Sequence, residues 1–233
     1  FLGLVAAVAA THAWADYPVV VLNSAAANIT LIDQSTRQVT ETYAVGKEPH
    51  HLMPTPDGKT LLVANSVSNN LMFVDPKTGK VTKTLEGIED PYQLGFSPDG
   101  KWFVTNGLRL DRVYSYANGN FTLAKRIPLG KTPSHMTFSS DSKLVFITLQ
   151  DSDELAAIDL ATQQVAWKMP VGKTPAGLWL TPHDQYVLIG MTGEDNVEVI
   201  DWRNRTIVKR IQTGRGAHNF RPANDGRHVF VTN

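Results

Sequence analysis

The chain has 233 residues, with 22 Lys and Arg balanced by 22 Asp and Glu, seven His, 13 Pro, 17 Gly and no Cys. A net charge of zero argues against nucleic acid as a partner and against attachment to a membrane surface through basic residues. Without cysteine, disulfides, thiolate metal sites and cysteine nucleophiles are excluded, so any chemistry must come from histidine, carboxylate or hydroxyl groups.

The first 15 residues predict a signal peptide. The stretch from Phe1 to Ala15 contains no Lys, Arg, Asp or Glu and ends in Ala13-Trp14-Ala15, which is typical of a cleavage site. It is too short to span a membrane. We therefore expect residues 1–15 to be a signal peptide that lacks its start, and residues 16–233 to be periplasmic or secreted, with no membrane span.

The rest of the chain repeats with a period of 42 residues. Prolines recur at that spacing, at Pro49, Pro91, Pro133 and Pro175. Aspartates keep the same register in two columns, one with Asp57, Asp99, Asp141 and Asp225, the other with Asp33, Asp75, Asp159 and Asp201. A period of this length built from short elements is typical of propellers rather than of helical arrays.

One repeat, residues 45–86, predicts four short strands. Extended segments at residues 50–55, 60–65, 71–74 and 80–85 are separated by the turn signals Pro56-Asp57-Gly58 and Asp75-Pro76 and by a polar loop. Pro presets φ, Gly closes a bend, and Asp accepts hydrogen bonds from its own backbone. Four strands with turns about every ten residues predict one antiparallel blade.

The sequence therefore predicts an all-β fold, a β-propeller of four-stranded antiparallel blades with about five blades present. The expected repeats are residues 17–44, 45–86, 87–128, 129–170, 171–212 and 213–233. The second aspartate column stands at turn starts, so we expect those carboxylates to cap the backbone rather than to form a catalytic set.

Particular motifs make the chain resemble the YVTN-repeat β-propeller family. They are Ser97-Pro98-Asp99-Gly100 followed by Phe103-Val104-Thr105-Asn106, and Val199-Ile200-Asp201. The resemblance runs from about Tyr17 to the last residue and specifies fold far more than activity. It implies seven blades in an intact protein, of which this chain would be a C-terminally incomplete part. It also implies kinship with quinoprotein-dehydrogenase-like propellers and with the haem propeller of cytochrome-type nitrite reductases.

In propellers of this kind the segment that leads into the innermost strand lies at the mouth of the central channel. Four histidines fall in that segment, and Tyr92 and Gln93 occupy the same columns in a further repeat. The candidate ligand-binding residues are His50, His51, Tyr92, Gln93, His135 and His218. Adjacent side chains of an extended strand point to opposite sides, so His50 and His51 are not expected to face the channel together, and convergence of all four histidines cannot be assumed.

Three functions remain open. The first is an exported, monomeric, non-enzymatic propeller that holds a protein, peptide or small-molecule ligand on its upper face without a cofactor. The second is a haem- or metal-binding propeller with a redox role, with His51 and His135 as the favoured pair; zinc would need nitrogens about 2.1 Å from the ion. The third is a lactonase-like hydrolase, which is disfavoured because no carboxylate set can be assigned to the channel.

Overall fold

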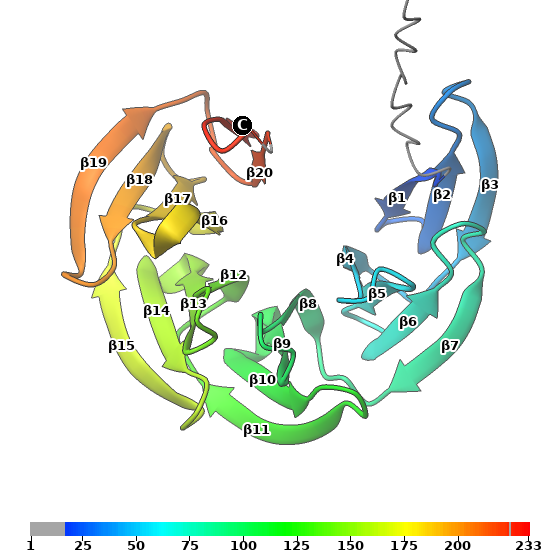
Figure 1. The fold of residues 1–233 in the computed structure, drawn as a ribbon, viewed down its shortest axis with the longest axis horizontal. Helices are drawn as coiled ribbons and strands as arrows, with labels where there is room; N and C mark the ends of the chain where they lie inside the picture. The colour runs from blue at the N-terminus through cyan, green and yellow to red at the C-terminus, as the bar shows by residue number, and fades with distance from the viewer. Residues whose placement is uncertain (1–16, 224) are drawn as a thin grey trace, which may run out of the picture.

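The computed structural model describes residues 17–223 and 225–233, so the expected signal peptide lies outside the described residues. Six antiparallel sheets stand side by side around an arc (Figure 1). The first sheet has three strands, the next four have four strands each, and the last has two. The all-β expectation is confirmed, and the sheets are the blades of a propeller of about five blades.

The strands follow one another in chain order within each blade. The first blade contains β1 (Val19–Asn23), β2 (Asn28–Ile32) and β3 (Val39–Ala44). The second contains β4 (Pro49–Pro54), β5 (Leu61–Asn65), β6 (Asn70–Val74) and β7 (Val81–Glu86). The third contains β8 (Pro91–Phe96), β9 (Trp102–Gly107), β10 (Arg112–Ala117) and β11 (Thr122–Pro128). The fourth contains β12 (Pro133–Phe138), β13 (Leu144–Leu149), β14 (Glu154–Asp159) and β15 (Gln164–Pro170). The fifth contains β16 (Pro175–Leu180), β17 (Val187–Met191), β18 (Asn196–Asp201) and β19 (Thr206–Gln212), and the last sheet contains β20 (Phe220–Pro222) and β21 (Val229–Val231).

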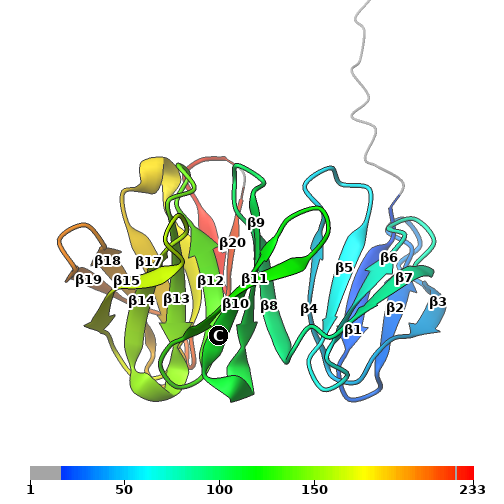
Figure 2. The same cartoon turned by 90° about the horizontal axis from the view of Figure 1, so that it is seen from below.

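The first strand of each four-stranded blade lies nearest the centre of the arc and the fourth lies at its periphery (Figure 1). Seen from the side, the blades stand upright between two faces (Figure 2). Because the strands alternate in direction, the turns between strands one and two and between three and four share one face, which we call the lower face. The loops between strands two and three and between blades share the other, the upper face.

The hydrophobic core lies between the blades. Successive residues of a strand point to opposite sides of its sheet, and β5 shows this: Leu62 and Ala64 pack toward the third blade, whereas Val63 packs toward the first. All three side chains are fully buried. At roughly 1.5 to 3 kcal/mol for each large apolar side chain, these contacts hold neighbouring blades together and so position the loops of the upper face.

The aspartates of the lower face cap turns, as expected from the sequence. The Asp33 carboxylate accepts hydrogen bonds from the main-chain nitrogens of Ser35 (3.0 Å) and Thr36 (2.7 Å). Asp75 accepts from Lys77 and Thr78, both at 2.9 Å. Hydrogen bonds from Ser35 and Thr36 lower the pKa of Asp33 to about 2. The repetition of these carboxylates therefore reflects the turns and not a catalytic set.

Each inner strand begins in the same irregular way. The residue before the proline has a left-handed backbone, with φ of 49° at Glu48, 44° at Asp90, 60° at Thr132 and 50° at Thr174. A β-bulge follows the proline in all four complete blades. A bulge inserts one extra residue and breaks the alternation of side chains, which decides how the candidate site is built.

Candidate binding site at the channel mouth

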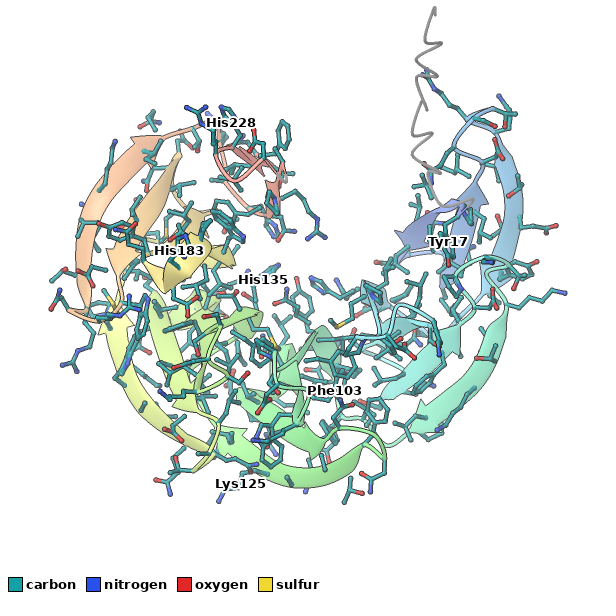
Figure 3. All side chains as sticks on the ribbon, in the orientation of Figure 1. Tyr17, Phe103, Lys125, His135, His183 and His228 are labelled. Carbon is teal, nitrogen blue, oxygen red and sulfur yellow. The ribbon has the colours of Figure 1, made fainter. Side chains whose placement is uncertain are left out.

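Five aromatic rings from four blades meet at the upper end of the inner strands. The Tyr92 ring lies 4.7 Å from His50 and 5.0 Å from His51, measured between ring centroids. The His135 ring lies 5.5 Å from His51, 5.9 Å from Tyr92 and 5.0 Å from His218. We call these five residues the mouth cluster. Figure 3 shows His135 on the inner side of the arc, whereas His183 and His228 lie away from it.

The expectation that His50 and His51 point to opposite sides is wrong. Pro49 pairs with Asn65 and His51 pairs with Ala64, so His50 is the extra residue of the bulge in β4. Because the bulge replaces the regular pleat at this point, both imidazoles lie against Tyr92. The sequence left open whether the four histidines converge, and the structure places all four in the mouth cluster.

His218 reaches the cluster because the blade between it and His135 presents glycine. His218 lies just before β20, and Gly177 on β16 stands between the two imidazole-bearing segments. A Cβ on Gly177 would lie 2.1 Å from the main-chain oxygen of His218 and 2.9 Å from the Asn219 Cα. A side chain at position 177 would therefore push the chain outward, and glycine permits the close approach.

Gln93 does not join the mouth cluster. Its side-chain oxygen accepts a hydrogen bond from the main-chain nitrogen of Met136, which ties β8 to β12. Asn106 joins the same two blades by donating to the Ser134 carbonyl at 2.9 Å, and Thr148 joins the fourth blade to the fifth by donating to the Ala176 carbonyl at 2.7 Å. These side chains hold the inner strands in register across the blade interfaces.

Three of the four imidazoles of the mouth cluster, those of His51, His135 and His218, are held in the neutral form. Burial lowers the pKa of His51 to about 4, against a smaller raising effect of a hydrogen bond to the Tyr92 main chain, and neighbouring His50, His218 and Arg221 lower it further. Burial, followed by repulsion from His51 and His218, lowers the pKa of His135, and burial lowers that of His218. At neutral pH these three rings therefore carry no charge.

Two nitrogen atoms in the mouth cluster are buried without a hydrogen-bond partner among the described residues. They are Nδ1 of His51 and Nε2 of His135. The His135 side chain is otherwise enclosed, with 1% of the residue exposed, while His51 is half-buried and His50 is exposed. Buried polar atoms in native proteins are nearly always paired, so these two nitrogens mark where a ligand could bind.

The charged side chains in the loops of the upper face form ion pairs and hydrogen bonds with one another and with the main chain. Asp153 forms an ion pair with Lys173 and accepts the Thr174 main-chain N–H at 2.9 Å. Arg109 bridges Glu48 at 3.0 Å and Asp90 at 2.6 Å. Within the described part of the chain, no group of three or more His, Asp or Glu residues is placed to hold a metal ion. No helix there is long and apolar enough to cross a membrane.

Radially arranged antiparallel sheets with a site at the inner strands define this protein as a β-propeller. The chain belongs to the YNCE-like β-propeller family, whose sequence profile matches residues 2–233. The YVTN-repeat resemblance is thereby confirmed as far as a β-propeller family goes. A search of curated proteins finds no significant match.

Two solved structures share the fold. One is a functionally unknown protein from Desulfotomaculum acetoxidans, with a TM-score of 0.78 and 16% identity over 91% of this chain and 71% of that chain. The other is hydrazine synthase from Kuenenia stuttgartiensis, with a TM-score of 0.62 and 18% identity over 97% of this chain and 96% of that chain. At such low identity the likeness shows the fold alone.

Proposed function

We propose that this propeller is a binding protein whose small-molecule ligand sits on the mouth cluster. The observation that carries the proposal is the convergence of His51, Tyr92 and His135 from three different blades around two buried nitrogens without partners. Sites of this kind combine an apolar, aromatic lining with a few polar atoms that orient the ligand. Neutral rings also spare the ligand the cost of displacing a tightly held counter-ion.

The uneven composition of the mouth supports a ligand with distinct ends. The positions equivalent to Ser134 and His135 are Tyr92 and Gln93 in the third blade but Ala176 and Gly177 in the fifth. One side of the mouth therefore presents rings and polar atoms, while the fifth blade contributes the small residues Ala176 and Gly177, which carry no polar side chain. An asymmetric molecule would bind in one orientation. Export to the periplasm or cell exterior is part of the same proposal and rests on the sequence of residues 1–15.

The test is nuclear magnetic resonance of the whole chain with isotope-labelled histidine, titrated with sugars, amino acids, nucleosides and aromatic acids as probes. We expect at least one probe to shift the ring signals of His51, His135 and His218 together. The double variant His51→Ala and His135→Ala should abolish that binding, while His183→Asn, on the exposed turn η3 (Pro182–Asp184), should not. Binding that survives the double variant would overturn the proposal.

A haem or divalent metal is the second candidate, favoured by the same two bare nitrogens. His51 Nδ1 and His135 Nε2 belong to neutral imidazoles, the form of histidine that binds metal ions. When bound, a haem would supply redox chemistry at the mouth cluster, and a divalent metal would supply Lewis-acid or redox chemistry. A visible absorption spectrum and elemental analysis of the purified protein test it: a stoichiometric chromophore or metal supports this candidate, and their absence removes it.

A further inference from the structure

The buried residues behind His135 form a chain of hydrogen bonds that ends on a main-chain carbonyl. Nδ1 of His135 lies 3.1 Å from the Ser134 hydroxyl, which lies 3.1 Å from the Thr148 hydroxyl. Thr148 in turn donates to the Ala176 carbonyl at 2.7 Å. Each of these residues is 1% exposed or less. Internal partners, rather than water, therefore determine where the protons of this chain lie.

The carbonyl at the end sets the direction of the whole chain. A carbonyl can only accept, so the Thr148 proton points to Ala176 and its oxygen is free to accept from Ser134. Ser134 then accepts from His135, which places the imidazole proton on Nδ1. The opposite arrangement, with Ser134 donating to His135, makes one hydrogen bond fewer and leaves a buried N–H at Nε2 without a partner. Orphaned N–H groups are rarer than orphaned acceptors.

His135 therefore carries a bare lone pair on Nε2, an atom without exposed surface, so a ligand reaches it only where a neighbouring ring of the mouth cluster moves aside. Neighbouring imidazoles oppose a positive charge on His51 and His135, and Arg221 opposes it at His51 as well. A cationic ligand would meet the same opposition. An anionic ligand would gain from Arg221 but would meet, at Nε2, an acceptor that repels it.

We propose that the mouth cluster binds an uncharged ligand that donates an N–H or O–H to His135 Nε2 while its flat apolar body lies against the Tyr92 ring. This inference rests on the proposed function and names the ligand class, an uncharged aromatic amide or alcohol. The bare acceptor, the uncharged rings of His51, His135 and His218 and the half-buried ring of Tyr92 together select that class. A hydrogen bond to a buried acceptor, once formed, removes the cost of leaving it unpaired.

The tautomer can be tested without any ligand. Long-range proton–nitrogen correlation spectra of the whole chain with labelled histidine distinguish a proton on Nδ1 from one on Nε2. We expect the His135 proton on Nδ1, with Thr148→Ser leaving it there because the hydroxyl is kept. Ser134→Ala breaks the chain of hydrogen bonds and should yield a mixture of the two His135 tautomers. A proton on Nε2 in the unmodified protein would overturn the inference whatever the mouth binds.

The ligand class is tested with four probes that share one ring. Benzamide is an uncharged donor, methyl benzoate an uncharged non-donor, benzoate an anion and benzylammonium a cation. At neutral pH we expect benzamide to shift the mouth signals and to bind about tenfold more tightly than methyl benzoate, the value of one hydrogen bond. The charged probes should bind more weakly than benzamide.

Variants separate this inference from the proposed function. Ser134→Ala should reduce the preference for benzamide over methyl benzoate to about threefold or less, Thr148→Ser should retain it, and His183→Asn should leave it unchanged. Equal binding of methyl benzoate, or tighter binding of benzoate or benzylammonium, would overturn the ligand class while leaving the mouth as a binding site. The ligand class would also be overturned if millimolar benzamide shifted no histidine ring signal of the mouth cluster while another probe did.

Discussion

Residue type varies less between equivalent repeat positions on the lower face of the propeller than on the upper face. On the lower face Asp33, Asp75 and Asp159 occupy one column and all accept main-chain hydrogen bonds within their own turn. On the upper face the column that holds His135 holds Gly177 one blade later. Where a side chain holds the backbone of a turn, the repeat keeps aspartate in every blade but the third, which has Ala117. Where the backbone is held by bulges and blade contacts, side chains vary more, and the variation produces the mouth cluster.

The two faces also respond to acid for opposite reasons. Burial lowers the pKa of the His51 imidazole by disfavouring its charged form, whereas hydrogen bonds lower the pKa of the Asp33 carboxyl by favouring its charged form. Both effects make the folded state bind fewer protons than the unfolded chain, so both lose stability on acidification. The histidine window lies between pH 6.5 and about 4, and the aspartate window lies between pH 3.8 and about 2.

The largest expected effect is the acid response of the mouth. As pH falls from 6.5 toward 4, the unfolded His51 takes up a proton that the folded ring resists, which removes about 3 kcal/mol of stability at most. His51→Gln should flatten the dependence of unfolding free energy on pH across that window, measured by urea denaturation. His183→Asn, on the exposed turn, should keep the parental slope. Identical slopes for His51→Gln and the parent would contradict the buried-imidazole account.

The close approach of His218 gives the next effect. Gly177→Ala places a Cβ 2.1 Å from the His218 oxygen, so we expect a loss of about 2 kcal/mol and a changed ring signal for His218. Gly58→Ala serves as the control because nothing lies within 4 Å of its Cβ and only its φ of 68° opposes the substitution, at about 1 kcal/mol. An unmoved His218 signal in Gly177→Ala would refute the role of this glycine.

Thr148→Val should cost somewhat less. The valine keeps the shape of the side chain but leaves the Ala176 carbonyl and the Ser134 hydroxyl without their partner, at about 1.5 kcal/mol. Thermal unfolding measures the loss. Thr206→Val on the exposed outer strand β19 should change stability by less than about 0.5 kcal/mol. Equal melting temperatures for the two variants would show that the buried hydroxyl contributes nothing.

The smallest effect belongs to a single lower turn. Asp159→Ala removes hydrogen bonds from the Thr162 main-chain nitrogen (2.7 Å) and hydroxyl (2.9 Å), and we expect a loss of about 1 kcal/mol. The loss should be present at neutral pH and disappear at acid pH, where the parental carboxyl is protonated. Thr162→Ser keeps both donors and should unfold like the parent. A loss that is the same at pH 7 and below pH 2 would contradict the capping role.

The predictability of the site from sequence differs residue by residue. Position in the repeat was enough to select His135 and His218, because equivalent positions of the repeat occupy equivalent places in each blade. The convergence of His50 with His51 was missed, because the bulge after Pro49 is a property of strand pairing and has no residue signature in the alternation rule. Gln93 was selected by column alone, yet its oxygen serves the backbone of the next blade.

The residues that sequence reasoning overlooked are those that act through neighbours in other blades. Ser134 and Thr148 are ordinary strand residues in the sequence, separated along the chain, and only the pairing of β12 with β13 brings their hydroxyls together. Gly177 occupies the repeat position equivalent to His135, and the sequence showed only that a histidine is missing there. That this glycine permits the close approach of His218 depends on how the last strands fold against the fifth blade.

The amino-acid sequence by itself determined the propeller, because a 42-residue period, turn aspartates and alternating apolar residues are local properties that each blade expresses in the same way. It also determined that histidine is the distinctive chemistry of the upper face. The tertiary structure alone decided that four imidazoles and one phenol meet, that three of the imidazoles are neutral, and that two of their nitrogens are buried without a partner among the described residues. Those outcomes depend on burial and on hydrogen bonds between blades, which join residues far apart in the chain.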